Sequence, residues 1–192
     1  MCLHLLTQSM SCLSPTIADW LRQSGQSTDQ AAGLALIGLG ANLPSLAGGP
    51  ADTLVAAKRH LDGLSAIPVL LSPVMTSRPV DCPPGSPDFC NAVAVVLPKG
   101  DCTPMQLLSD LHSIEQVFGR QRSGLRNEAR PLDLDLLAFA DAVVDDDKLQ
   151  LPHPRATQRE FVLRPLSHIW PDYRFPGTDQ TVKSLLTALS GS

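Results

Sequence analysis

The stretch RPLDLDLLAF, Arg130 to Phe139, limits the fold of this chain more than any other feature. It is rich in leucine, yet it carries Asp133 and Asp135 one residue apart. Because side chains alternate between the two faces of a strand, both aspartates would share one face while the leucines fill the other. A strand of this kind buries its leucine face against helices. Its carboxylate face is either solvated or part of a site, and both interpretations are open at this point.

Arginines gather on both sides of this strand in the sequence. Paired carboxylates bind hard divalent cations such as Mg²⁺, and guanidinium groups bind phosphate oxygens through two parallel hydrogen bonds. A polyphosphate with its metal ion needs both groups, so the combination predicts a metal–nucleotide site; a solvated run of charges is the alternative. The residues concerned are Arg120, Arg122, Arg126 and Arg130 upstream, and His153, Arg155, Arg159 and Arg164 downstream.

The charge and cysteine content narrow the function classes further. The chain has 15 Lys and Arg against 19 Asp and Glu, and this net charge of −4 argues against general attraction to nucleic acid or an anionic membrane. Five cysteines without a C-x-x-C pair argue against zinc and disulfides and favour the reducing cytoplasm. We expect no membrane span, because no apolar window reaches roughly 18 residues, and no signal peptide, because the first residues lack a basic region.

The first 32 residues differ in composition from the rest of the chain. They are rich in serine and glutamine, with one short helix expected at Thr16–Gln23. We interpret residues 1–32 as an appended, mobile arm. At 192 residues the chain is long enough for one well-packed core. The ordered domain is therefore expected to span residues 33–192.

The order of apolar segments after residue 33 predicts the fold class. The pattern β-α-β-β-α-β corresponds to the ferredoxin-like split βαβ plan of an α+β protein, an antiparallel sheet with two helices on one face. We expect loops or ligand to cover the opposite face. The segments are strands at 34–40, 69–77 (interrupted by Pro73), 92–98 and 130–139, helices at 51–64 and 103–119, a hairpin through Asp141 into Val143 and Val144, and a C-terminal helix at 180–189.

Five blocks of sequence resemble those of one known family. The blocks are G-A-N-L (40–43), P-D-F-C-N-A-V (87–93), I-E-x-x-x-G-R-x-R (114–122), R-x-x-A-R-x-L-D-L-D-L-L-x-F (126–139) and L-P-H-P-R-x-x-x-R-x-F-V-L-x-P-L (151–166). With them, the chain resembles 6-hydroxymethyl-7,8-dihydropterin pyrophosphokinase from about Leu34 to Leu189. This folate-pathway enzyme moves a diphosphate from ATP to the hydroxymethyl group of the pterin. Five blocks in order are more specific than any one of them.

The resemblance implies a role for each candidate residue. Asp133 and Asp135 would hold two Mg²⁺ ions that bridge the phosphates of the co-substrate ATP, and Arg120 and Arg130 would act with them in catalysis. The residues implied at ATP are Glu115, Arg120, Arg122, Arg126, Arg130, His153 and Arg159. Those implied at the pterin are Ser77, Val80, Phe89, Asn91 and Phe161, with the two aromatic rings on either side of the substrate and Asn91 hydrogen-bonded to its edge. On residue type alone, Phe89 and Phe161 would be core residues, His153 a turn cap and Glu115 a solvated helix residue.

The arginine-rich loop departs from the family pattern R-W-G-P-R-T. Asn127 replaces the tryptophan and Glu128 a glycine, and a carboxylate beside phosphates is electrostatically unfavourable. Two other functions therefore stay open: an ATP- and pterin-binding relative with impaired turnover, and a palm-type two-metal nucleotidyltransferase. A nucleic-acid-binding module is less well supported, because the aromatic strand motif is absent. We expect a monomer acting on small molecules, with association with other folate enzymes left open.

Overall fold

The structure is a computed structural model that describes residues 13–80, 82–120 and 128–191. No helix in this part of the chain is long and apolar enough to cross a membrane. The helices are α1 (Pro15–Gln23), α2 (Pro50–Leu64), α3 (Pro104–Val117), α4 (Glu160–Ile169) and α5 (Val182–Ser190), with 3-10 turns η2 (Thr28–Gly33) and η3 (Ala156–Gln158). The strands are β1 (Ala35–Ala41), β2 (Leu70–Leu71), β3 (Met75–Ser77), β4 (Phe89–Val96), β5 (Asp133–Phe139), β6 (Val144–Asp145) and β7 (Gln150–Leu151).

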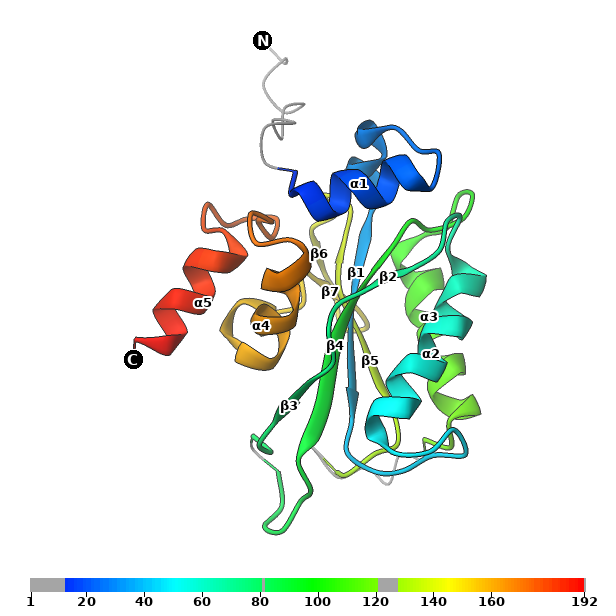
Figure 1. The fold of residues 1–192 in the computed structure, drawn as a ribbon, viewed down its shortest axis with the longest axis vertical. Helices are drawn as coiled ribbons and strands as arrows, with labels where there is room; N and C mark the ends of the chain where they lie inside the picture. Colours follow the sequence, from blue (N-terminus) through cyan, green and yellow to red (C-terminus); the bar gives the residue numbers. More distant parts are fainter. Residues whose placement is uncertain (1–12, 81, 121–127, 192) are drawn as a thin grey trace.

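One antiparallel sheet forms the centre of the molecule (Figure 1). Its strand order is β2-β4-β1-β5, with β3 also paired to β4, and every one of these pairings is antiparallel. Within the described residues β5 is therefore an edge strand of this sheet. Together with α2 between β1 and β2, and α3 between β4 and β5, this arrangement confirms the predicted ferredoxin-like α+β class.

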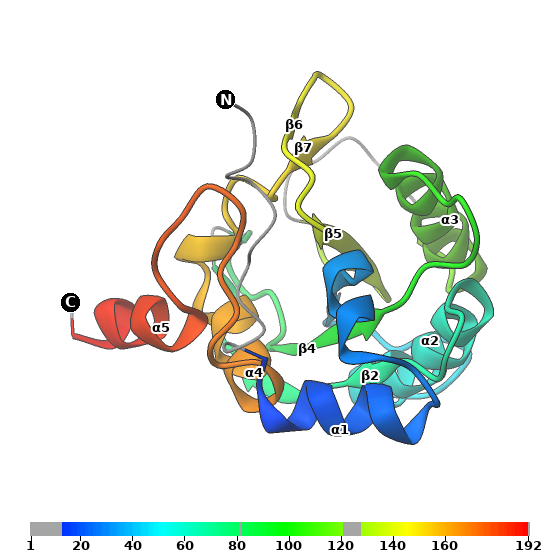
Figure 2. The same cartoon turned by 90° about the horizontal axis from the view of Figure 1, so that it is seen from above.

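Helices α2 and α3 pack on one face of the sheet, as expected (Figure 2). Helix α3 begins where the capping sequence predicted, because Thr103 Oγ1 accepts a hydrogen bond from the Gln106 N–H at 3.2 Å and proline occupies the first turn. Leu134 and Leu136 of β5 point into this core. The fully or almost fully buried residues at the contact include Leu54 and Leu61 of α2, Leu107 and Leu111 of α3, and Leu134 and Leu136 of β5, with Leu132 just before that strand.

The opposite face of the sheet is covered by helices, which the sequence interpretation did not anticipate. Helices α1 and α4 pack there against apolar residues of β1, β4 and β5 in a second core (Figure 2). Helix α4 was missed because Pro165 lies inside it, and proline inside a run usually argues against a helix. The expectation that loops or ligand cover this whole face is therefore wrong. A cavity remains at the N-terminal end of α4, and it forms part of the site described below.

Residues 14–32 are not the mobile arm that their composition suggested. Ile17 and Leu21 of α1 are completely buried in the second core. The Ser14 hydroxyl donates a hydrogen bond to the carbonyl oxygen of Ile169, at the end of α4, over 2.7 Å. The short helix has a narrow apolar face. The composition of the segment did not reveal this face, because serines and glutamines surround it. The expected boundary at residue 33 is thus not a boundary of the packed core.

Two local expectations also need correction. The predicted hairpin at Asp141 forms further along the chain, where Val144 of β6 pairs with Leu151 of β7. Its turn is closed by Asp146, whose Oδ1 accepts the Lys148 and Leu149 N–H groups at 2.8 Å each. Strand β4 begins at Phe89, three residues before the expected start. This extension places the aromatic residue on the sheet.

The buried face of α1 predicts a cost for shortening it. Leu21→Ala should lower the free energy of unfolding by about 2–5 kcal/mol, because the surrounding core would be left with a cavity. The neighbouring Arg22→Ala is the matched control: it removes only an exposed pair with Asp19 and should change stability by less than about 1 kcal/mol. Denaturant unfolding of both variants measures the difference. Equal stabilities would show that α1 does not contribute to the core.

Candidate active site

The carboxylates of β5 face a part of the sheet that has few side chains. Residues that pair across antiparallel strands share a face, so Gly40 and Asn91 lie in one row with Asp133, and Gly38 lies beside Asp135. A Cβ atom at Gly40 would lie 3.6 Å from Asn91 Oδ1 and 3.8 Å from Asp133 Cβ. The missing side chain therefore leaves open space between the aspartate and the asparagine.

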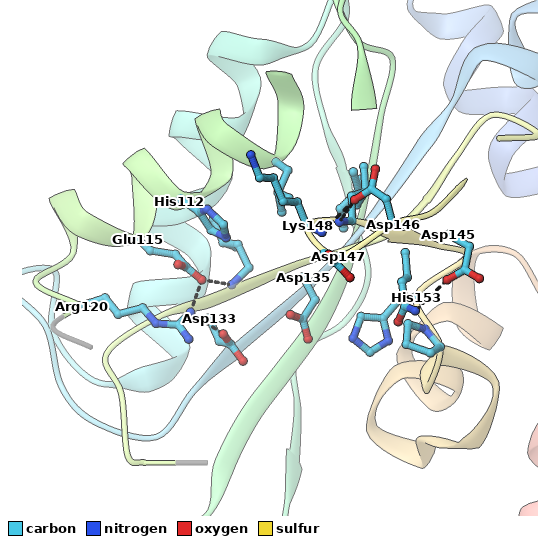
Figure 3. Close-up of a pocket in the computed structure, with 16 residues that line it drawn as sticks. His112, Glu115, Arg120, Asp133, Asp135, Asp145, Asp146, Asp147, Lys148 and His153 are labelled. Atoms are coloured by element: carbon cyan, nitrogen blue, oxygen red, sulfur yellow. Dashed lines mark hydrogen bonds and ion pairs between the residues drawn. The ribbon is translucent and has the colours of Figure 1, made fainter. Parts of the chain in front are cut away.

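Two cavities meet at these aspartates. The larger, of about 790 Å³, lies between α3, β5 and the β6–β7 hairpin (Figure 3). The smaller, of about 230 Å³, is lined by residues of β3 and β4, by the loop that follows β3, and by the segment leading into α4. Asp133 and Asp135 line both cavities. Ligands bound in the two cavities would meet at this pair of carboxylates.

Asp133 is held by two arginines. Its Oδ2 lies 2.7 Å from Arg130 Nη2, and its Oδ1 pairs with Arg120 Nη1. The Arg130 backbone is fixed in turn by Asn42, whose Oδ1 accepts the Arg130 N–H at 2.8 Å and whose own N–H donates to the Arg130 carbonyl at 3.1 Å. The Arg130–Asp133 pair is therefore anchored to the end of β1 through the backbone of Arg130, and not only through the ion pair itself.

Asp135 lies in a less favourable electrostatic environment. Burial raises the pKa of its carboxyl group above the usual range, and the charge of Asp133 raises it further; His153, Arg159 and Arg130 act in the opposite direction. Among the described residues Asp135 pairs with Arg159, whose Nη1 lies 3.4 Å from Asp135 Oδ2. Burial lowers the pKa of His153, an effect that Asp135 opposes and that Arg159 strengthens. The imidazole is held beside the strand by its backbone, because the His153 N–H donates to the Leu137 carbonyl at 2.9 Å.

The smaller cavity combines aromatic rings with one buried amide. Asn91 Nδ2 donates to Ser77 Oγ at 2.9 Å, which fixes the orientation of the amide on the cavity floor. The guanidinium carbon of Arg130 lies 5.8 Å from the centre of the Phe89 ring, and that of Arg159 lies 5.3 Å from the centre of the Phe161 ring. Both arginines that pair with the aspartates from this side therefore also contact a ring by cation–π interaction. A flat, partly polar ligand suits this cavity.

A family model described as 7,8-dihydro-6-hydroxymethylpterin-pyrophosphokinase matches residues 36–171. The chain belongs to this family. A 2-amino-4-hydroxy-6-hydroxymethyldihydropteridine pyrophosphokinase of Pseudomonas aeruginosa is 37% identical over 144 residues, 73% of this chain and 82% of that protein. The protein of the same name from Haemophilus influenzae is 35% identical over 145 residues, 75% of this chain and 86% of that one.

Solved structures agree on the fold. A Plasmodium falciparum HPPK-DHPS structure matches 81% of this chain with a TM-score of 0.59 at 15% identity. Another HPPK-DHPS structure, in complex with substrates, matches 81% with a TM-score of 0.61 at 12% identity. The chain covers 43% and 45% of those longer proteins, less than half of each. At this identity the likeness supports the fold alone.

The residues that the pyrophosphokinase resemblance implied fall into three spatial groups. Arg120 and Arg130 pair with Asp133, while Arg159 and His153 lie beside Asp135, so these six residues form one polar cluster. Glu115 is buried in the wall of the larger cavity, contrary to a solvated helix position. The predicted Arg122 and Arg126 lie outside the described residues, as does Asn127. The smaller cavity is lined by Ser77, Val80, Phe89, Asn91 and Phe161.

Several residues of this region were not selected from the sequence. Asn42 lies in the G-A-N-L block, and its amide was a usable signal because it follows an apolar strand directly. The turn Asp145–Lys148 lines the larger cavity, and Figure 3 shows it across the cavity from His112 of α3. The run D-D-D-K in the sequence could have indicated a turn, but nothing in it indicated a cavity wall. Arg155, which was grouped from the sequence with the basic residues downstream of the strand without being given a role, lines the smaller cavity beside Arg159.

The raised pKa of Asp135 predicts that this residue costs stability. The ionised carboxylate is less favourable in the folded state than in the unfolded state, so stability falls as the pH rises from the ordinary aspartate pKa of about 4 to the raised folded value. Asp135→Asn should therefore raise the melting temperature at pH 8, and this gain should disappear near pH 3. The exposed Asp141→Asn serves as control, and thermal unfolding across this pH range measures both. A variant less stable than wild type at pH 8 would contradict the prediction.

Proposed function

We propose that this chain transfers the terminal diphosphate of ATP to the hydroxymethyl oxygen of 6-hydroxymethyl-7,8-dihydropterin and releases AMP. The observation that carries the proposal is the position of Asp133 and Asp135 at the boundary of two different cavities. The larger is polar and lined by several carboxylates together with Arg120 and Lys148, which suits a nucleotide that binds with Mg²⁺. The smaller has aromatic rings and an oriented amide, as a flat heterocycle requires. Transfer between two substrates needs such a shared boundary.

In the proposed reaction the pterin hydroxymethyl oxygen forms a bond to the β-phosphorus of ATP. The bond from that phosphorus to the oxygen shared with the α-phosphate breaks, AMP leaves with the electron pair, and the hydroxyl proton is released. Arg120 and Arg130 lie where they can bind the transferred phosphates and offset the charge that develops on them. Arg159 and His153 are assigned to the nucleotide phosphates beside Asp135.

The donor set at the boundary fits magnesium. Among the described residues no group of three or more carboxylate, imidazole or thiol side chains could hold a metal ion by itself. Mg²⁺ is commonly held by one or two carboxylates, with substrate phosphates and water completing the shell, and Asp133 and Asp135 supply two such carboxylates on one face. When bound there with ATP, Mg²⁺ would offset phosphate charge and help to align the diphosphate. We propose that Asp133 and Asp135 together would hold two Mg²⁺ ions.

On the pterin side, we assign the ring faces to Phe89 and Phe161 and the polar edge to Asn91. The Asn91 amide is 5% exposed and already donates to Ser77, so its orientation is set before a ligand arrives. Val80 is exposed at the rim of this cavity and would contact the substrate through its backbone or methyl groups. The monomeric state, the association with other folate enzymes and the cytoplasmic location remain predictions.

The decisive experiment is direct. Purified protein with ATP, Mg²⁺ and the hydroxymethyldihydropterin should form AMP and the pterin diphosphate in equal amounts. Tight pterin binding with a non-hydrolysable ATP analogue, but without turnover, would favour the impaired relative. Turnover of nucleotides without pterin binding would favour the palm-type nucleotidyltransferase, which has no use for the aromatic cavity.

Removing either carboxylate should nearly abolish transfer. Asp133→Asn and Asp135→Asn should each lower the rate on the order of a thousandfold, because a metal clamp that loses one ligand loses transition-state stabilisation. The exposed Asp141→Asn should keep wild-type activity. Rates are measured as AMP formed at saturating Mg²⁺, with circular dichroism as a check of folding. Near-normal rates in either folded variant would contradict the metal assignment.

The loop departure gives a gain-of-function prediction, although Asn127 lies outside the described residues. If Asn127 and Glu128 hinder closure over ATP, the double variant Asn127→Trp with Glu128→Gly should raise kcat more than it raises affinity for ATP. Closure acts on the transition state after the nucleotide has bound. Steady-state kinetics and calorimetric ATP binding separate the two quantities. Unchanged kcat would mean that these two departures do not limit turnover.

A further inference from the structure

One carboxylate in the wall of the larger cavity is almost inaccessible to a ligand. Glu115, on the last turns of α3, is 2% exposed, although the cavity that it lines is open and polar. Buried carboxylates are costly unless charges and hydrogen bonds compensate them. The contacts that compensate Glu115 therefore indicate what this side chain does.

The first contact is with the backbone between the two aspartates. Glu115 Oε1 accepts the Leu134 N–H at 2.8 Å. This N–H is on the outer side of the edge strand β5, where no neighbouring strand of the main sheet accepts it. The bond joins α3 to the peptide that follows Asp133 and precedes Asp135. This hydrogen bond fixes the position of the strand segment that carries both aspartates relative to α3.

The second contact is with a cation of the same cluster. Arg120 Nη1 pairs with both Glu115 Oε1 and Asp133 Oδ1, so one guanidinium bridges the helix carboxylate and the strand carboxylate (Figure 3). The Arg120 backbone N–H also donates to the Glu115 carbonyl oxygen at 3.1 Å. This bond holds the backbone of the two residues close together. Burial alone would lower the pKa of Arg120, but Asp133 and Glu115 raise it overall. The guanidinium is thus held charged in a fixed place.

We infer that Glu115 is a positioning residue, which sets Arg120 and the aspartate-bearing strand relative to each other and does not itself bind the nucleotide. This inference rests on the proposed function and departs from the ATP-contact role that the family resemblance implied. Glu115 contributes through two separable parts. Its oxygen accepts the Leu134 N–H, and its negative charge orients Arg120.

Glutamine and alanine separate these two parts. Glu115→Gln keeps an oxygen of nearly the same shape for the Leu134 N–H but removes the charge that orients Arg120. Glu115→Ala removes both. We expect the glutamine variant to lower kcat at least tenfold while KM for ATP changes less than threefold, and the alanine variant to lower kcat further. Exchange of the Leu134 amide hydrogen should be unchanged in the glutamine variant and at least tenfold faster in the alanine variant.

A double variant tests whether Glu115 acts through Arg120. In an Arg120→Ala background, Glu115→Gln should reduce kcat by less than twofold further, because the guanidinium that it orients is already gone. Asp19→Asn, which breaks the exposed Arg22–Asp19 pair on α1, is the matched control and should leave kcat unchanged.

The outcomes are distinguishable. Wild-type protein that forms no AMP would remove the proposed function, and the Leu134 exchange data would still test the structural link. If the wild type is active, a rise in KM or in the calorimetric Kd for a non-hydrolysable ATP analogue, with kcat preserved, would make Glu115 a nucleotide ligand. If Glu115→Gln lowers kcat by a full tenfold in the Arg120→Ala background, Glu115 does not act through Arg120 and the inference is overturned.

Discussion

The pairing of two neighbouring carboxylates with arginines is the interaction on which this site depends. Asp133 and Asp135 share one face of an edge strand at the margin of a core, where two like charges would be unfavourable without partners. The arginines come from separate segments: Arg120 follows α3, Arg130 precedes β5, and Arg159 precedes α4. Because each pair joins a different segment to β5, the charges that form the site also hold together the segments that surround it.

In this cluster the arginines neutralise the aspartates. It is therefore suited to bind a ligand that brings both phosphates and cations. Phosphates can replace the carboxylates as partners of the guanidinium groups, and cations can replace the guanidinium groups as partners of the carboxylates. Neither set of protein charges is then left buried and unpaired. The arginines and carboxylates are already partly desolvated and held in place, which lowers the reorganisation needed when the ligand binds. The net charge of the chain is −4, so the positive charge of these arginines is a local feature of the cluster.

Local patterns predicted much of this fold, and tertiary contacts explain the rest. Alternation in RPLDLDLLAF correctly placed the two aspartates on one face, and the T-x-x-Q sequence located the start of α3. The packing of α1 could not be predicted, because nine residues between polar segments show too little periodicity to indicate a partner. The burial of Glu115 was also invisible, since a glutamate on a helix usually faces water. Its contacts in the folded chain account for the burial, because Glu115 accepts the Leu134 N–H on the outer side of an edge strand and pairs with Arg120.

One face of the sheet changes from core to site within two residues on each strand. On β5 the completely buried Leu137 follows Asp135 on that face, and on β4 the completely buried Val93 follows Asn91. The change occurs where the covering helix α4 begins, with Arg159 and Phe161 at its N-terminal end. Strands β4 and β5 are therefore held in place by packing of their apolar half, while their other half presents polar side chains to the site. Because several side chains of the site extend directly from core strands, their positions depend on the packing of the core. Helix α1 contributes to that packing, although none of its residues lines either of the two cavities described.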